Sequence, residues 1–454
     1  MAHPRHDEGW VRTESAPETS PPPSTIGFAG WVSENLFPNW WHGLLTVLGS
    51  LFLVGIAWDV LVFAVIKANF IGIDREACLV TITPAGSEPG FFGKLIGSTE
   101  PGACWAYVGA KFGQFMYGFY PFEERWRANI CYLVGALALA PLLMPALPYK
   151  RENAIFVLLI YPLMVLILLS GGNLDIDAGT WTSFGIFVAV LAVVLGFLSE
   201  IAGILERGMV ITVWVATTLI IGAILFVLGF DFGLVPVETA KWGGLMVTLV
   251  VAVTGIVASL PLGILLALGR RSEMPVVKLF SVVFIEVWRG VPLITVLFMA
   301  SVMLPLFLPE GVSFDKLLRA LIGTALFSAA YMAETVRGGL QAIPKGQYEA
   351  ASALGLSFWR SMGLIILPQA LKIVIPGIVN TFIGLFKDTT LVSIIGIFDV
   401  LGIVNSSFSD PNWASSVTAP TGYFAAALIF WIFCFGMSRY SMFMERLLHT
   451  GHKR

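Results

Sequence analysis

Charged residues and histidine are scarce in this sequence. Only 12% of the residues are Asp, Glu, Lys or Arg, and the five histidines, at positions 3, 6, 42, 449 and 452, all lie near the two ends. A membrane-embedded enzyme needs a cluster such as HExxH, or paired carboxylates beside a nucleophile, and no such pattern is present. The formal net charge of -2 predicts no nucleic-acid partner.

A nucleotide-binding loop is also missing. The nearest string, GFFGKL at residues 90–95, lacks the four-residue spacing from a first glycine and has Leu where Ser or Thr should follow the lysine. We therefore expect that this chain does not hydrolyse ATP, is not an enzyme by itself and holds no cofactor. Its four cysteines fit no CxxC spacing, so no metal site is predicted.

Apolar residues, by contrast, are abundant: they make up 57% of the chain, and the mean hydropathy is +0.84. A lipid bilayer is the natural solvent for such a chain, and about 20 apolar residues suffice for one spanning helix. We predict an all-α membrane bundle of about ten transmembrane helices, near residues 44–66, 130–148, 154–170, 183–205, 209–229, 242–268, 278–308, 317–337, 371–396 and 422–444. Residues 1–43, which contain the run SAPETSPPPST, are predicted to form a disordered tail.

Basic residues in the short loops predict the orientation, because Lys and Arg are retained on the cytoplasmic side of a membrane. Five basic sites fall on one side if the N-terminus is cytoplasmic: Lys150–Arg151, Arg207, Arg270–Arg271, Lys345 and Arg360. An even number of spans then places the C-terminus in the cytoplasm too. The opposite, periplasmic side receives a long aromatic-rich loop at residues 67–129.

Two of the cysteines, Cys78 and Cys104, lie in that long loop. An oxidising compartment permits a disulfide between them, and two free thiols are an equally acceptable interpretation. A bond between them would close a loop of about 26 residues and stabilise the fold by about 3 kcal/mol.

The hydrophilic stretch at residues 343–370 contains the most specific pattern in the chain. Glu349, Ala350 and Ala351 are followed by Gly355 and then by Ile365, Leu367 and Pro368, and together these residues match EAA-x3-G-x9-I-x-LP. Residues 348–354 are good helix formers, and Gly355 can end that helix with a positive φ. The pattern predicts a short exposed cytoplasmic helix whose alanines enter a groove on a partner, while Glu349 meets a basic residue there.

This stretch resembles the cytoplasmic loop of ABC importer permeases, in which a coupling helix docks on the ATP-hydrolysing subunit. The resemblance covers about residues 240–446 and implies a type I importer-like core in the C-terminal half, situated in a bacterial inner membrane. It also implies four partners: an ATPase dimer that binds ATP and Mg, a second and related permease subunit, a periplasmic amino-acid-binding protein, and the bilayer. Transport would proceed by alternating access, with no covalent chemistry in this chain.

The flanking sequences are similar to polar amino-acid permeases of the histidine/glutamine type. They are RGVPL at 289–293, AYMAETVRGGL at 330–340 and PKGQYEAA at 344–351. Residues 44–235, a five-span extension, resemble long permeases of general L-amino-acid or glutamate/glutamine/aspartate/asparagine systems. Acidic amino acids and their amides are therefore the expected substrates. The extension either enlarges the dimer or holds the binding protein, and the sequence does not rank these roles.

Ionisable residues inside spans are expensive and are functional candidates by default. The run Lys387, Asp388, Thr389 and Thr390 offers a cation, an anion and hydroxyls to a zwitterionic amino acid; the alternative interpretation is a buried Lys–Asp pair or a kink that stabilises the helix. Two further pairs, at i, i+3 spacing, are predicted to be structural anchors or docking points: Glu286 with Arg289, and Glu334 with Arg337.

Two other classes of membrane protein are less compatible with these patterns. A secondary transporter driven by an ion gradient predicts inverted repeats and helices broken at the midplane, and no clear internal repeat is visible. A structural or sensory membrane protein leaves the spaced pattern at residues 349–368 without an explanation. The sequence therefore favours an ATP-driven importer.

Overall fold

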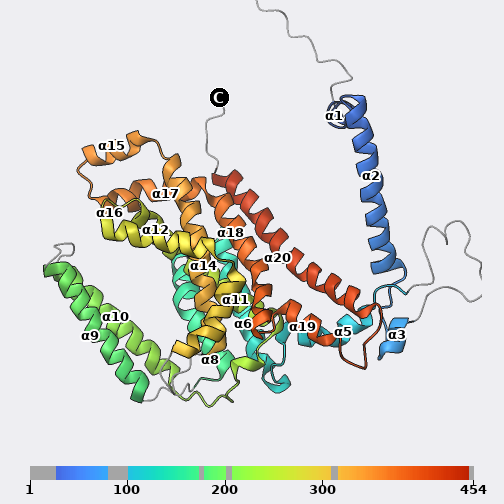
Figure 1. Ribbon diagram of the computed structural model, residues 1–454, viewed down its shortest axis with the longest axis horizontal. Coiled ribbons are helices and arrows are strands. Elements are labelled where there is room, and N and C mark those ends of the chain that lie inside the picture. Colours follow the sequence, from blue (N-terminus) through green and yellow to red (C-terminus); the bar gives the residue numbers. More distant parts are fainter. Residues whose placement is uncertain (1–26, 80–100, 173–177, 201–206, 308–314, 449–454) are drawn as a thin grey trace, which may run out of the picture. The chain divides into compact units, whose positions relative to one another are not determined.

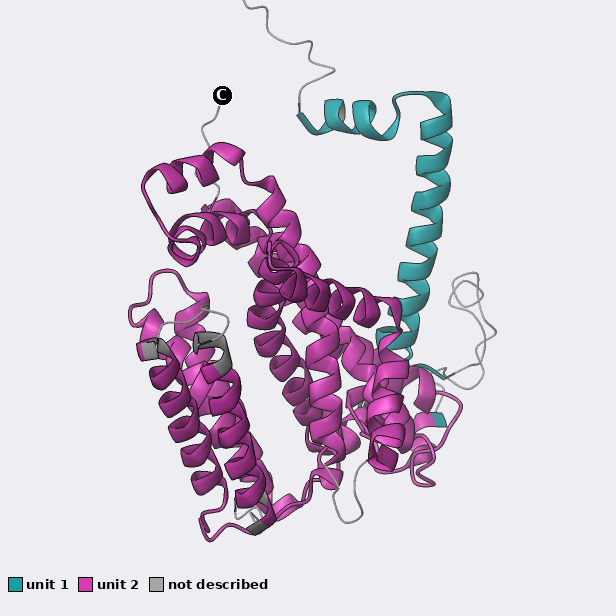
Figure 2. Cartoon of the chain, turned by 60° about the vertical axis from the view of Figure 1, so that its left-hand side comes forward, with its two compact units in different colours: residues 1–70, 79–103 teal, residues 71–78, 104–454 magenta. Residues whose placement is uncertain are grey.

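The structure is a computed structural model, and it describes residues 27–79, 101–172, 178–200, 207–307 and 315–448. These residues form two compact units, one drawn from residues 1–70 and 79–103 and the other from residues 71–78 and 104–454 (Figure 2). Helices account for the regular structure, and the described ranges contain isolated β-bridges but no strand.

The smaller unit contains one long apolar helix. Residues Trp40–Leu61 form α2, which continues through a wider turn, η2, at Val62–Ile66. A short helix, α1, precedes it at Gly27–Leu36, so the predicted disordered tail of residues 1–43 is wrong for this stretch; residues 1–26 lie outside the described ranges. The backbone amide of Ala103 donates to Phe63 at 2.8 Å and so brings residue 103 to the end of α2.

The larger unit begins with helices that the sequence assigned to an external loop. Here α3 spans Arg75–Leu79, α5 spans Trp105–Tyr117 and η3 spans Phe122–Glu124. The remaining helices before the C-terminal half are α6 (Arg125–Leu143), α7 (Lys150–Ile155), η4 (Phe156–Ile160), α8 (Tyr161–Ser170), α9 (Ala178–Glu200), α10 (Arg207–Leu228) and η5 (Thr239–Lys241). The predicted loop at 67–129 is therefore largely helical where it is described, and residues 80–100 lie outside the description.

The C-terminal half contains the helices that carry the site. They are α11 (Gly244–Arg270), α12 (Pro275–Gly290), α13 (Leu293–Phe298), η6 (Met299–Met303), η7 (Leu304–Phe307), α14 (Lys316–Ala342), α15 (Lys345–Ala353), α16 (Phe358–Ser361), η8 (Met362–Ile366), α17 (Leu367–Ile373), α18 (Ile375–Asp388), η9 (Thr389–Ile395), α19 (Val400–Ser407) and α20 (Thr418–Leu448).

Helices α11 and α14 run side by side in this half (Figure 1). Small residues permit the close approach, because a Cβ atom added at Gly263 of α11 would lie 2.7 Å from Cβ of Met332 on α14. Helix α14 is rich in buried alanine, namely Ala320, Ala325, Ala329, Ala330 and Ala333. Packing of small residues is the usual basis of helix association in a membrane, where lipid is as apolar as the helices.

Eight helices in the described ranges are long and apolar enough to cross a membrane, and a ninth span results if α12 and the segment Leu293–Phe307 are counted together. A shorter apolar stretch in α9, Trp181–Gly196, corresponds to the remaining predicted span. The all-α membrane bundle is therefore confirmed.

Two predicted spans differ in detail from the helices observed. The span at 278–308 is bent by 100° between Gly290 and Leu293. Pro292 lacks a backbone N–H and forces the preceding Val291 into an extended conformation, so the helix cannot continue. The span predicted at 130–148 instead runs from Phe122 to Leu143. Its start is earlier because Arg127, only 2% exposed, pairs with Glu124 at 2.7 Å and is tolerated inside the fold.

Candidate functional site

The short helix α15 has a well-defined beginning and end. Pro344 precedes it with φ -57° and ψ 141°, which suits the residue before a helix. At the other end, Gly355 adopts a φ of +68°, the left-handed conformation expected of it. The amide of Gly355 donates to Ser352 at 2.9 Å, and that of Leu356 donates to Ala351 at 3.2 Å, so the last carbonyls of α15 have partners. These two bonds form a Schellman motif.

The sequence predicts that the alanines of α15 lie on its surface, but one of them does not. Glu349 and Ala350 are exposed, but Ala351 is only 1% exposed. The reason is that α15 packs against η8 and α16, later elements of the same loop, and Ala351 lies on the buried side. A partner could therefore contact Glu349 and Ala350 directly, whereas Ala351 holds α15 on its own loop.

Pro368 lies where the loop returns to the bundle. It occupies the first turn of α17, where a missing backbone N–H costs little. The preceding turn, η8, contains Ile366, which is fully buried in a cluster with Val336 and Leu340 of α14. The residues between α15 and α17 thus connect the exposed helix to a packed part of the fold.

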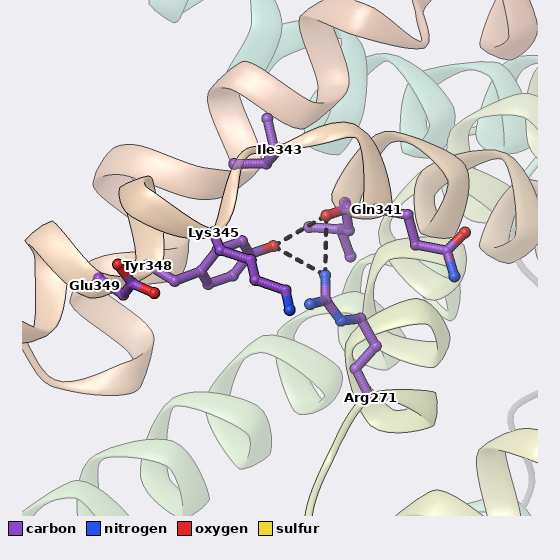
Figure 3. Close-up of a pocket in the computed structure, with 7 residues that line it drawn as sticks. Arg271, Gln341, Ile343, Lys345, Tyr348 and Glu349 are labelled. Carbon is purple, nitrogen blue, oxygen red and sulfur yellow. Dashed lines mark hydrogen bonds between the residues drawn. The ribbon is translucent and has the colours of Figure 1, made fainter.

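A cleft of about 440 Å³ lies beside α15. Its lining comes from the end of α11, the end of α14 and the start of α15, namely Arg271, Leu340, Gln341, Ile343, Lys345, Tyr348 and Glu349 (Figure 3). Arg271 and Tyr348 are joined by a hydrogen bond of 2.9 Å from Nη1 to Oη. Of this group the sequence predicts Glu349 as a site residue, but not Arg271 and Tyr348, because nothing in the sequence brings residues 77 positions apart together.

The four ionisable residues predicted to pair at i, i+3 spacing form a cross-helix cluster. Glu334 pairs with Arg337 at 2.6 Å, as the spacing predicts, and also with Arg270 at 2.9 Å and Arg289 at 3.8 Å. Glu286 pairs with Arg270 at 2.9 Å, so the predicted pair of Glu286 with Arg289 is wrong. Helices α11, α12 and α14 meet here, so Glu286 and Arg289 of α12 each pair with a residue on another helix.

The four residues at 387–390 separate in the structure. Asp388 lines a cleft of about 330 Å³ with Tyr331, Asn380 and Thr381, among others, and Lys387 does not line it. The hydroxyls of Thr389 and Thr390 donate to backbone carbonyls three residues earlier, at 2.8 and 2.9 Å. Asn380 was not among the predicted residues, although its spacing of eight residues from Asp388, with Gly384 between them, places all three on one face of α18.

At the opposite end of α11, α5 packs against α11, α19 and α20. Cys78 and Cys104 are joined in a disulfide, one of the two states that the sequence left open. Lys111 of α5 lies 2.5 Å from Asp410, and its ammonium holds the pKa of that carboxyl below its ordinary value. Part of the N-terminal half is thereby fastened to the C-terminal half.

Comparisons with known proteins identify relatives of this chain. A family described as "Binding-protein-dependent transport system inner membrane component" matches residues 259–448. The inner membrane amino-acid ABC transporter permease protein YhdY of Escherichia coli (strain K12) is 45% identical over 93% of this chain and 93% of its own length.

Two further likenesses cover different amounts of the chain. The glutamate/glutamine/aspartate/asparagine transport system permease protein BztC of Rhodobacter capsulatus is 44% identical over 98% of this chain and 100% of its own length. A solved structure of an amino acid ABC transporter with histidines is 30% identical over 45% of this chain and 92% of that chain, with a TM-score of 0.40.

Proposed function

This chain belongs to the family of amino-acid ABC transporter permeases of the inner membrane, and we propose that it is one membrane subunit of an ATP-driven importer. The proposed substrates are glutamate, glutamine, aspartate and asparagine. The observation that carries this proposal is the likeness to BztC, which extends over the N-terminal extension as well as the C-terminal half.

The proposed mechanism is alternating access, powered by a separate pair of ATPase subunits that bind ATP and Mg. The exposed helix α15 is well placed to dock on such a subunit, since Glu349 and Ala350 face outward while Ala351 packs inward. Arginine or lysine on the ATPase would meet Glu349 in a charge-assisted hydrogen bond. We assign α15 to the cytoplasm, together with both chain ends, from the basic residues of the short loops.

For the substrate, we propose a route past the cleft at Asp388. A carboxylate can accept hydrogen bonds from the ammonium of an amino acid, and the neighbouring Asn380 amide offers both donors and acceptors. Lys387 and the two threonines are less suitable, because Lys387 lies outside the cleft and the hydroxyls are committed to the backbone. We further propose that a second, related permease subunit completes the pathway and that a periplasmic binding protein delivers the amino acid.

Uptake in proteoliposomes tests the proposal. The complex purified with its ATPase and second permease would be supplied with the binding protein, ATP and each labelled amino acid in turn. We expect ATP-dependent uptake that falls at least about tenfold in Glu349→Lys, since a lost charge-assisted bond is worth about 1.5–3 kcal/mol. Gly355→Asp should reduce uptake too. Uptake that follows an ion gradient and ignores both substitutions would contradict the assignment.

A further inference from the structure

Two adjacent arginines stand at the end of α11. Arg270 is the last residue of that helix, and its Nη1 lies 2.9 Å from Oε1 of Glu286 on α12 and 2.9 Å from Oε1 of Glu334 on α14. Because one guanidinium carries several donors in a rigid plane, a single arginine can hold two carboxylates in a defined arrangement. Arg270 therefore ties α11 to both of its neighbours.

Arg271, the next residue, makes a second junction on the other side. Its Nη1 donates to the carbonyl of Leu340 at 3.1 Å and to Oη of Tyr348 at 2.9 Å. Tyr348 Oη itself donates to the same carbonyl at 3.0 Å, which closes a triangle of hydrogen bonds (Figure 3). The guanidinium also lies over the Tyr348 ring, 5.3 Å from its centre. Arg271 thus joins the ends of α11 and α14 to the first turns of α15.

These junctions matter because they add polar links between α15 and the spanning helices to the packing of the Tyr348 ring on a buried cluster that includes Leu268 and Leu340. Among the described elements it packs mainly against η8 and α16, which belong to its own loop. If α15 moved only together with η8 and α16, α11 could stay in place. The hydrogen bonds of Arg271 and Tyr348 give α15 a direct polar link to α11, a helix 77 residues away in the sequence.

We propose that Arg271 and Tyr348 are positioning residues that transmit the movement of α15 to α11, and that Arg270 passes it on to α12 and α14. This inference rests on the proposed function, since it assigns a route for the movement that ATP drives. The route leads to α12, whose end is the 100° bend before α13, a point at which a span can change direction. Arg271 is exposed, so its bonds add little to folding stability and act chiefly through geometry.

The test measures how many ATP molecules are hydrolysed per amino acid imported, in proteoliposomes that hold the complete complex. Arg271→Gln removes the charge, Arg271→Lys keeps the charge without the planar fork, and Tyr348→Phe keeps the ring without the hydroxyl. We expect the ratio to rise up to about fivefold in Arg271→Gln, the size expected for lost bonds of an exposed charged group, and less in Tyr348→Phe. Arg446→Gln, which removes an exposed arginine from the end of α20, should leave it unchanged.

The double variant Arg271→Gln with Tyr348→Phe separates a relay from two independent effects. If the two side chains act through their mutual contact, the double variant should be no worse than Arg271→Gln alone. The relay would be overturned by wild-type ratios in both single variants or by additive losses in the double variant. It would also be overturned if the variants lost the ATPase subunit on purification. A wild-type complex with no ATP-dependent uptake would instead refute the proposed function, and the relay with it.

Discussion

Asp399 is a buried carboxylate whose ionisation should lower the stability of this protein at neutral pH. It lies between the spans that end at Ile395 and begin at Thr418, and its side chain is 0% exposed. Its oxygens accept hydrogen bonds from the amides of Gly402 at 2.8 Å and Leu401 at 3.2 Å, at the start of α19. Burial outweighs these bonds and raises the pKa of Asp399 from 3.8 to about 6.

The sign of the effect follows from the raised pKa. The folded protein binds this proton more tightly than the unfolded chain, so the favourable contribution is fully present below about pH 4 and is lost as pH rises through about 6. A rise in pKa from 3.8 to about 6 corresponds to about 3 kcal/mol between those limits. Asp399→Asn removes the titration and keeps an oxygen that can cap α19.

Thermal unfolding of the purified complex in detergent, followed by tryptophan fluorescence between pH 5 and pH 8, checks this prediction. The variant introduces an amide with two buried donors, which can cost about 1–3 kcal/mol at every pH, so the informative quantity is the slope with pH. We expect Tm of Asp399→Asn to gain a few degrees relative to wild type as pH rises. Parallel Tm curves for the two proteins would refute the reasoning.

Two further predictions concern backbone conformation and the disulfide. Gly355→Ala should destabilise the end of α15 by about 1–2 kcal/mol, because the φ of Gly355 is +68°, although a Cβ there would meet open space. The control Gly346→Ala, within α15, should not have this effect. Hydrogen exchange of residues 345–356 checks the prediction, and equal protection in the two variants would show that it is wrong. Cys104→Ser should destabilise the fold by about 3 kcal/mol, because it opens the disulfide that closes a 26-residue loop. Cys434→Ser, which removes a free thiol, should leave the stability unchanged. Equal Tm values for the two variants would contradict this prediction.

Several features of the fold could be predicted because they depend on local sequence alone. Apolar runs of about 20 residues identify spanning helices whatever surrounds them, since backbone groups in lipid must be satisfied within the helix. The end of α15 at Gly355 was likewise predictable, because glycine adopts a positive φ without the steric cost of a Cβ. The spaced pattern from Glu349 to Pro368 could be recognised as that of the family because all of its residues lie within one loop.

The errors arose where distant residues meet. The i, i+3 spacing predicted Glu286 with Arg289, but Arg270 of another helix lies 2.9 Å from Glu286 and takes that place. The predicted surface position of Ala351 was wrong because α15 packs against η8 and α16 and Ala351 is buried. The helical character of residues 105–117 was missed because α5 owes its place to packing against α11, α19 and α20.

The sequence by itself determined the membrane class, nearly all of the spanning helices and the short helix that ends before Gly355, since each of these follows from interactions within a short stretch of chain. Tertiary structure alone decided which charges pair, that Asp388 rather than Lys387 lines a cleft, and that Arg271 meets Tyr348 across 77 residues. The physical reason is that a hydrogen bond or ion pair depends on distances of about 3 Å between atoms, and only the packing of helices against one another sets such distances for residues far apart in the chain.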